Sequence, residues 1–490
     1  MPQGRILMTN MAAVAVGKGA TAVAGLLTIM VLTRDLGPHE FGYYRTVLTY
    51  NAFAAVLTDL GVYLVGLREM SRPGADISRV IGNALFLRLA STATILFVAS
   101  LLALLLPYDV EVRRGIFLGA LIYTAIQGSE FLVAVFQHAM KQAGNALAEA
   151  TGAFVTLAGV WLLSLLHANV LGMLCATLCG ATTALTVSWV LARRLVPFRP
   201  RFEPSVWRQY IVAGLPIAGS HIFSMAMLRG DTLLLSVLKP AADVGLYGVP
   251  TKMFELTLSL PFMFAGLMMP LMTAAAARAG IKGPLGAASA SDRDFSRLLG
   301  RALDAMLMFG VGAVLALSLF APEILAFISG TAFGAGAPAL VILSFASLLT
   351  ALSVVLRYSL IALDRPRAVL AADAAACAVA LVAYFTLIPK FSLVGAAIGT
   401  AIAEASVLCG MLFGLRRAGQ ALPRCPSAPK TLLAGAAAAG AMLLMSHLGA
   451  AWMVALAMGG IIYLLLLALT GAIPRDLAVT LLRRPRVGDA

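Results

Sequence analysis

The chain has 490 residues, of which 61% are hydrophobic and 12% are charged, and its formal net charge is +14. Its mean hydropathy is +0.93, whereas ordinary soluble domains carry about 25% charged residues. These values exclude a soluble globular protein and indicate a chain that lies in a lipid bilayer.

Fourteen apolar segments are long enough to cross a bilayer as helices, since a span needs about 20 residues. Backbone groups that face lipid must form hydrogen bonds within their own segment, and the alternating pattern of a membrane β-barrel does not occur. We therefore predict an all-α polytopic membrane protein. The predicted spans cover residues 6–33, 41–66, 79–106, 114–137, 146–167, 168–192, 208–238, 244–272, 297–321, 335–363, 366–389, 391–415, 430–448 and 450–473.

The order of these segments repeats along the chain. Arg193-Arg194 and Arg416-Arg417 each end an apolar segment, 223 residues apart, and Leu171-Gly172 and Val394-Gly395 show the same offset. Nearer the start of each copy, Phe41-Gly42-Tyr43-Tyr44 aligns with Val244-Gly245-Leu246-Tyr247. Many membrane transporters build a substrate site between two such duplicated bundles. The repeat therefore favours transport.

The repeat also divides the chain into three predicted parts. Residues 1–200 form a six-helix lobe, residues 201–425 form a second six-helix lobe, and residues 426–490 hold accessory helices 13 and 14 with a cytoplasmic tail. A linker rich in Pro and Arg, from Arg193 to Arg208, joins the two lobes.

The basic residues predict the orientation. One set of alternate connections, which includes both termini, holds 25 of the 36 Lys and Arg residues, and the other set holds five. The positive-inside rule then places both termini in the cytoplasm. This distribution accounts for the net charge, so we expect no nucleic-acid partner. The first apolar segment contains Lys18 and is expected to remain as a span, not as a cleaved signal peptide.

Features of an enzyme are not evident. The connections on the outer side are short, the longest lying around residues 322–334, and there is no phosphate-binding loop, nucleophile elbow or Cys-x-x-Cys pair. Cys175 and Cys179 share a helix face, but a packing role is favoured over a metal site because no further ligand is near. We expect no enzymatic activity, no catalytic residue, no cofactor and no metal.

Six cations lie within the predicted spans. Lys18, Arg88, Arg229 and Lys252 are the more deeply placed, and Arg45 and Arg357 are nearer an interface. A cation exposed to lipid at the centre of a span costs about 2.5–3.5 kcal/mol. A structural explanation, in which each is paired or extends to the interface, stays open. Our hypothesis is that Lys18, Arg88, Arg229 and Lys252, with Arg45, line a cavity that binds phosphate or pyrophosphate.

Four embedded acids of the second half are candidates for coupling transport to an ion. They are Asp231, Glu255, Asp373 and Glu404. A carboxyl group at membrane depth can change its protonation or hold a sodium ion. The simpler alternative is that Asp231 and Glu255 only balance Arg229 and Lys252.

Two stretches carry a family pattern. The first is Leu36-Gly37-Pro38-His39-Glu40-Phe41-Gly42-Tyr43-Tyr44, followed by Leu57-Thr58-Asp59-Leu60-Gly61, and the second is Asp231-Thr232-Leu233-Leu234-Leu235, running to Val244-Gly245-Leu246-Tyr247 and Lys252. They resemble the lobe openings of Wzx-type polysaccharide and lipopolysaccharide flippases. That family belongs to the multidrug/oligosaccharidyl-lipid/polysaccharide (MOP) exporter superfamily, and the likeness in span count and duplication covers essentially the whole chain.

The resemblance implies a flippase in the cytoplasmic (inner) membrane of a bacterium. It implies two lobes that alternate between inward and outward openings and carry an undecaprenyl-pyrophosphate-linked oligosaccharide to the outer leaflet. Membrane lipid, and polysaccharide polymerase or assembly proteins, are the implied partners. Lipid-II flippases of the superfamily use cations in spans one, two and eight, which are the spans that hold Lys18, Arg45 and Lys252.

Two alternatives stay open. A drug or cation antiporter of the related MATE type would use acidic cavity residues and usually has twelve spans. A polytopic cell-envelope enzyme would need larger outer loops than this chain has.

Overall fold

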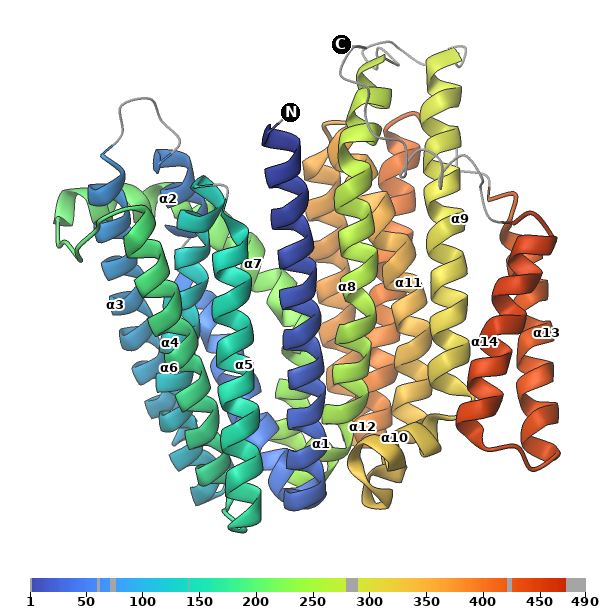
Figure 1. Cartoon of the computed structure of the whole chain (residues 1–490), viewed down its shortest axis with the longest axis horizontal. Coiled ribbons are helices and arrows are strands. Elements are labelled where there is room, and N and C mark those ends of the chain that lie inside the picture. Colours follow the sequence, from blue (N-terminus) through green and yellow to red (C-terminus); the bar gives the residue numbers. More distant parts are fainter. Residues whose placement is uncertain are drawn as a thin grey trace. The chain divides into compact units, whose positions relative to one another are not determined.

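The computed structural model describes residues 2–59, 62–70, 76–139, 141–278, 290–420 and 425–472 (Figure 1). Over these residues all regular secondary structure is helical, which confirms the predicted all-α class. The chain forms two compact units. Unit 1 comprises Met1–Val249 with Ile328–Phe333, and unit 2 comprises Pro250–Phe327 with Gly334–Ala490. The three-part division at residues 200 and 425 stays a prediction.

Unit 1 holds the helices of the first repeat and α7. They are α1 (Pro2–Asp59), α2 (Val62–Met70), α3 (Ile77–Ala103), α4 (Val110–His138), α5 (Gln142–Leu165), α6 (Val170–Leu195), α7 (Pro204–Leu238) and the first turns of α8 (Ala241–Arg278). Short polar side chains begin two of them: Asp76 accepts from the Arg79 amide at 3.0 Å, and Asn169 accepts from the Gly172 amide at 3.2 Å. Such caps satisfy amides that the first helical turn leaves without partners.

Helix α1 contains the predicted span at residues 6–33 and most of the predicted span at residues 41–66. Its break is at Gly37, whose φ of 67° and ψ of 179° suit glycine but few other residues. The first segment runs parallel to α5, because Gly17 lies beside Ala146 and residues 27–34 lie beside residues 154–161.

Contacts of the other helices give the direction of the second segment of α1. The pairs in contact are Val47 with Gly115 and Asn51 with Gly119 between α1 and α4, Gly115 with Leu174 and Ser129 with Ser188 between α4 and α6, and Gly152 with Ala184 and Gly159 with Ala176 between α5 and α6. The second segment is therefore parallel to α4 and α6, which run antiparallel to α5. It follows that the two segments of α1 cross the unit in opposite directions.

Unit 2 holds the remaining helices. They are most of α8, α9 (Ala290–Ser318), most of α10 (Ala321–Ser329), α11 (Ala337–Ala362), α12 (Pro366–Arg417), α13 (Ala428–His447) and α14 (Trp452–Leu469). The outer connection expected around residues 322–334 is itself helical, since it contains α10 and a short 3-10 helix, Thr331–Gly336. Glu323 in the first turn of α10 favours this helix, because a carboxylate complements the amides at a helix start.

Helix α12 folds back on itself at Ser392, which has a φ of 49°. Its contacts pair Ala372 with Gly410, Tyr384 with Gly399 and Leu387 with Gly395, as in an antiparallel hairpin. The hairpin of α5 and α6 turns at His167, whose φ is 48°, and Ser392 follows His167 by 225 residues. This spacing agrees with the sequence repeat, so the last two spans of both copies form the same hairpin.

Eleven of the described helices are long and apolar enough to cross a membrane. Because α1 and α12 each contain a break, they account for four of the predicted spans, and α7 covers the predicted span at residues 208–238. The chain is a multi-pass membrane protein.

Connections of unit 1 gather at two ends. At one end, the Tyr43 hydroxyl donates to Asp109 Oδ2 at 2.5 Å, and Tyr108 Oη lies 2.9 Å from Ser236 Oγ. These contacts bring the turn of α1 to the α3–α4 and α7–α8 connections, which belong to the set poor in Lys and Arg.

At the other end, Glu203 joins the linker to α3. Its carboxylate accepts from Arg79 and from Asn83, and these hydrogen bonds lower the pKa of Glu203 to about 2. A lowered pKa means that the contact is complete above the ordinary carboxyl pKa of about 4.3 and is lost only as the pH falls toward 2. The linker attachment is therefore insensitive to physiological pH.

We expect the Glu203 end to face the cytoplasm. Single cysteines at Leu105 and Phe202, in a variant with the five native cysteines replaced by Ser, place an exposed thiol at each end. The thiol at residue 105 should react with an impermeant maleimide added to intact cells, and the thiol at residue 202 should react only after lysis, because basic connections stay inside. The opposite labelling pattern would reverse the orientation.

Candidate functional site

Two of the predicted cations approach one tyrosine of unit 1. Arg45 lies on the second segment of α1 and Arg229 lies on α7, and both interact electrostatically with Tyr123 of α4. Glu130, two helical turns further along α4, also interacts electrostatically with Tyr123. Both guanidinium side chains are half-buried. Since Arg stays charged at physiological pH, this Tyr123 cluster (Arg45, Tyr123, Glu130 and Arg229) is a polar, cationic region within membrane-spanning helices.

The start of α8 shapes one side of this cluster. A Cβ on Gly248 would lie 3.0 Å from Arg45 Cγ and 3.1 Å from Arg45 Nε. The missing side chain lets the α8 backbone lie directly against Arg45, so the arginine side chain has little room to move in that direction.

Arg88 has a different environment. Its side chain is 5% exposed, and its guanidinium donates to Gln127 Oε1 at 3.0 Å. The Gln127 amide donates in turn to the Ala55 carbonyl at 3.0 Å. This network lies inside unit 1 and connects α1, α3 and α4, which is a sufficient structural role for a buried arginine.

Lys18 lies on the first segment of α1, where its side chain is exposed. Lys252 lies in unit 2, half-buried, with its Nζ 3.3 Å from Glu255 Oε2 on the next turn of α8. The i,i+3 ion pair expected from the sequence is therefore present.

Asp231 is a buried hydrogen-bond acceptor. It is 4% exposed, and it accepts from the Tyr247 hydroxyl at 2.7 Å and from the Thr232 amide at 2.5 Å. The first of these bonds connects α7 to α8. Asp231 thus fixes the packing of two helices, and these contacts do not require a coupling ion.

The acids Asp373 and Glu404 meet in unit 2. Arg357 of α11 donates to both carboxylate oxygens of Asp373 of α12, at 2.5 and 2.7 Å. Glu404, on the second segment of α12, lies near Thr350, whose hydroxyl donates to the Ala346 carbonyl at 2.9 Å, and interacts electrostatically with Arg357 and Asp373. We call Thr350, Arg357, Asp373 and Glu404 the Arg357 cluster.

Two members of these clusters, Tyr123 and Thr350, were not identified from the sequence. Tyr123 is one of several tyrosines within predicted spans, and no local pattern distinguishes it. Arg357 was expected near an interface with a structural explanation, but its bidentate partner, Asp373, is sixteen residues away on another helix. Only the folding of α11 against α12 brings the two together.

The described residues contain no group of three His, Cys, Asp or Glu side chains that could hold a metal ion. The charged groups described above include Arg45, Arg229, Glu130 and Asp231 in unit 1, and Lys252, Arg357, Asp373 and Glu404 in unit 2.

Solved structures of transporters share this fold. A structure described as the lipid II flippase MurJ in an inward closed conformation has a TM-score of 0.72 and 13% identity, and the match covers 95% of this chain and 99% of that one. An inward-facing multidrug resistance MATE family transporter of the MOP superfamily gives a TM-score of 0.59 at 15% identity, covering 81% and 94% of the two chains. A mutant of the Vibrio cholerae MATE transporter VcmN gives 0.52 at 15% identity, covering 84% and 97%. No match to a curated protein sequence was found.

A family match covers the first repeat and the start of the second. Residues 7–275, more than half of the 490-residue chain, match the family described as polysaccharide biosynthesis protein. Together with the fold shared with the lipid II flippase, this match confirms the resemblance that the two motif stretches predict. The chain therefore belongs to the polysaccharide biosynthesis protein family.

Proposed function

We propose that the protein moves an undecaprenyl-pyrophosphate-linked oligosaccharide from the cytoplasmic to the outer leaflet of the bacterial cytoplasmic membrane. The observation that carries this proposal is the approach of Arg45 and Arg229 to Tyr123 within membrane-spanning helices. Guanidinium groups bind phosphate oxygens in pairs, and Arg45 and Arg229 leave the cluster with a net positive charge even with Glu130 present. Family membership and the fold shared with a lipid II flippase support the proposal.

The charged head of such a substrate explains why a protein is needed. Sugar hydroxyls and a pyrophosphate lose their hydrogen bonds with water in hydrocarbon, at a cost of about 2–7 kcal/mol for each polar group left without a partner. A cationic region in the spans replaces part of that hydration. Lys18 and Lys252 are proposed as further contacts to the head group, and two alternating states of the transporter would expose the bound head to one side at a time.

The Arg357 cluster supports a second candidate, the MATE-type antiporter. Its carboxylates, Asp373 and Glu404, would suit a cationic substrate or a coupling ion. However, Arg357 neutralises one of the two charges through paired hydrogen bonds. The arginines at Tyr123 therefore favour the anionic lipid-linked substrate.

We expect Arg45→Ala and Arg229→Ala to reduce delivery of surface polysaccharide at least tenfold. Removing one of two guanidinium groups leaves about half of the charge that holds the pyrophosphate, and a bidentate charged contact contributes about 1.5–3 kcal/mol. Cells that lack the chromosomal copy and carry each variant would be compared for surface polysaccharide and for accumulated lipid-linked sugar.

Arg114→Ala is the matched control. Arg114 is an exposed cation of unit 1, on α4 but away from Tyr123, so its loss should leave export unchanged. Arg229→Lys keeps the charge and should retain part of the activity. Wild-type export by the double variant Arg45→Ala with Arg229→Ala, at normal membrane abundance, would contradict the proposed anion site. Export of a cationic dye that depends on Asp373 and Glu404 would support the antiporter instead.

A further inference from the structure

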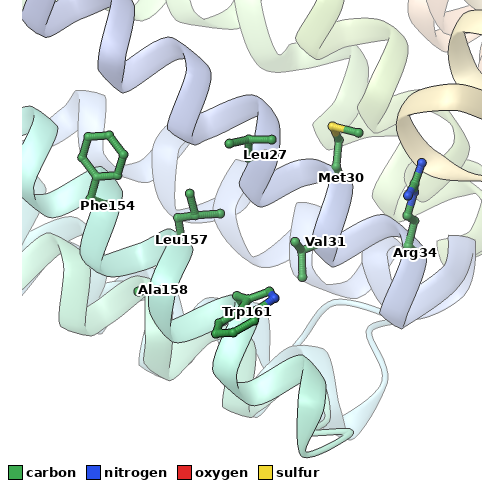
Figure 2. Close-up of a pocket in the computed structure, with 8 residues that line it drawn as sticks. All are labelled: Leu27, Met30, Val31, Arg34, Phe154, Leu157, Ala158 and Trp161. Atoms are coloured by element: carbon green, nitrogen blue, oxygen red, sulfur yellow. The ribbon is translucent and has the colours of Figure 1, made fainter.

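Unit 1 contains an apolar groove that the proposed pyrophosphate site does not use (Figure 2). Its volume is about 500 Å³, and we call it the α1–α5 groove. The lining residues are Leu27, Met30, Val31 and Arg34 of α1, with Phe154, Leu157, Ala158 and Trp161 of α5. Arg34 is the one charged residue among them.

The groove follows from the way the two helices pack. At one level α1 and α5 are in close contact, since a Cβ on Gly17 would lie 2.7 Å from Ala146 Cβ. Two turns further along, Gly25 has no atom of another element within 4 Å of its Cβ position. Along α5, Ala158 lies between the larger Phe154 and Trp161, and its small side chain leaves a hollow facing α1 (Figure 2). The close contact at Gly17 and the hollow at Ala158 therefore lie at different levels of the same helix pair.

The position of Arg34 gives the groove a direction. Arg34 is the last of the α1 lining residues, and its neighbour Asp35 has Oδ1 4.0 Å from His167 Nδ1 in the turn between α5 and α6. That turn lies at the end of the unit opposite to Glu203. The groove therefore runs from membrane depth toward the connections poor in Lys and Arg, with its cation at the interface.

The apolar lining is open to its surroundings. Leu27 is 43% exposed, Phe154 49% and Trp161 56%. In a membrane-spanning segment, surface of this kind contacts hydrocarbon chains. From Leu27 to Arg34 the helix rises about 10 Å, which is less than the hydrocarbon thickness of one leaflet, about 15 Å.

We propose that the α1–α5 groove binds an anionic phospholipid of the outer leaflet, with one acyl chain against Leu27, Phe154 and Trp161 and the phosphate at Arg34. The charge of Arg34 complements a lipid phosphate, and Trp161 favours the interfacial depth at which head group and chain meet. The groove length suits part of one acyl chain. An undecaprenyl chain is several times longer, so a phospholipid is the better match.

Trp161 provides a direct measurement. The chain has four tryptophans, and replacing Trp189, Trp207 and Trp452 by Phe leaves Trp161 as the only reporter. In nanodiscs we expect brominated phosphatidylglycerol to quench Trp161 with a preference of about fivefold over brominated phosphatidylcholine, as one basic residue at an anionic membrane surface predicts. Arg34→Gln should abolish the preference for phosphatidylglycerol, while quenching by phosphatidylcholine remains.

Arg114→Gln is the matched control, because it removes an exposed cation of the same unit outside the groove, and it should keep the preference. Ala158→Leu should fill the hollow and reduce quenching by both lipids, at an unchanged unfolding temperature. Equal quenching by the two lipids in the wild-type background, or a preference that survives Arg34→Gln, would overturn the proposal. Displacement of brominated phosphatidylglycerol by an equimolar amount of undecaprenyl phosphate would also overturn it and assign the groove to the carrier lipid.

Discussion

Gly245→Ala is expected to leave little stably folded protein. A Cβ on Gly245 would overlap the carbonyl group of Pro38, and a Cβ on Gly42 would overlap the carbonyl group of Ala241. All four residues belong to unit 1. Because the obstructing atoms are backbone, they cannot move aside by a change of rotamer. The destabilisation should exceed the usual 1–3 kcal/mol for added core atoms, and we expect about 3 kcal/mol or more. The unfolding temperature and the monodisperse fraction in detergent measure it.

Gly25→Ala is the control for this substitution. Gly25 lies in the same unit, within a span, and has no atom of another element within 4 Å of its Cβ position. Since Ala is favoured over Gly in a helix by about 1 kcal/mol, this variant should be as stable as the wild type or more so. A wild-type unfolding temperature for Gly245→Ala would show that the crossing of α1 and α8 can open without cost.

The two glycines also show what the sequence repeat means physically. Gly42 and Gly245 occupy the same place in the repeated stretches Phe41-Gly42-Tyr43-Tyr44 and Val244-Gly245-Leu246-Tyr247. In the structure each lies against the helix that carries the other. Close approach of helix backbones in a membrane requires small residues. The motif that identifies the family is therefore, at its glycine, a helix-crossing motif.

Helices and their order could be predicted from the sequence because the bilayer permits few alternatives. Each predicted span lies mainly within described helices, with the span at residues 41–66 divided between α1 and α2, and the hairpins that turn at His167 and Ser392 follow the predicted repeat. The helix breaks lie close to the predicted ones. Gly37 falls between the predicted spans 6–33 and 41–66, and Ser392 lies within three residues of the predicted boundary at 389–391, but the helices continue up to each break almost without a loop.

The candidate sites could be predicted only in part. Charge inside a span is costly, so the sequence indicates which residues need partners, but it does not identify the partners. Asp231 accepts from Tyr247, a contact the sequence did not predict, and its predicted role in balancing Arg229 or coupling an ion stays a prediction. Arg88 donates to Gln127 inside unit 1, and its predicted place in an anion-binding cavity stays a prediction. In both cases the deciding contact joins two helices, and helical periodicity does not determine such contacts.

The Arg357 cluster allows structural pairing and ion coupling to be separated. Arg357 and Asp373 are 27% and 14% exposed and form paired hydrogen bonds. Removing one member of a buried ion pair leaves an uncompensated charge, which typically costs 3–5 kcal/mol, whereas replacing both by apolar residues is often neutral. We therefore expect Arg357→Met and Asp373→Leu each to lower the unfolding temperature strongly, and the double variant to recover most of it.

Transport by that folded double variant decides the role of the carboxylates. Glu404 remains next to Thr350 in this background, so we expect the double variant to deliver polysaccharide with a dependence on an imposed proton or sodium gradient. We expect Glu404→Gln, which keeps the shape and removes the charge, to abolish that dependence in reconstituted vesicles. Thr350→Val, which removes only the neighbouring hydroxyl, is the control and should weaken the dependence without abolishing it. If flipping by Glu404→Gln responds to the gradient as the wild type does, coupling through Glu404 is wrong. The membrane potential acting on the cationic Tyr123 cluster would then be the simpler driving force, at about 2.3 kcal/mol per charge for each 100 mV.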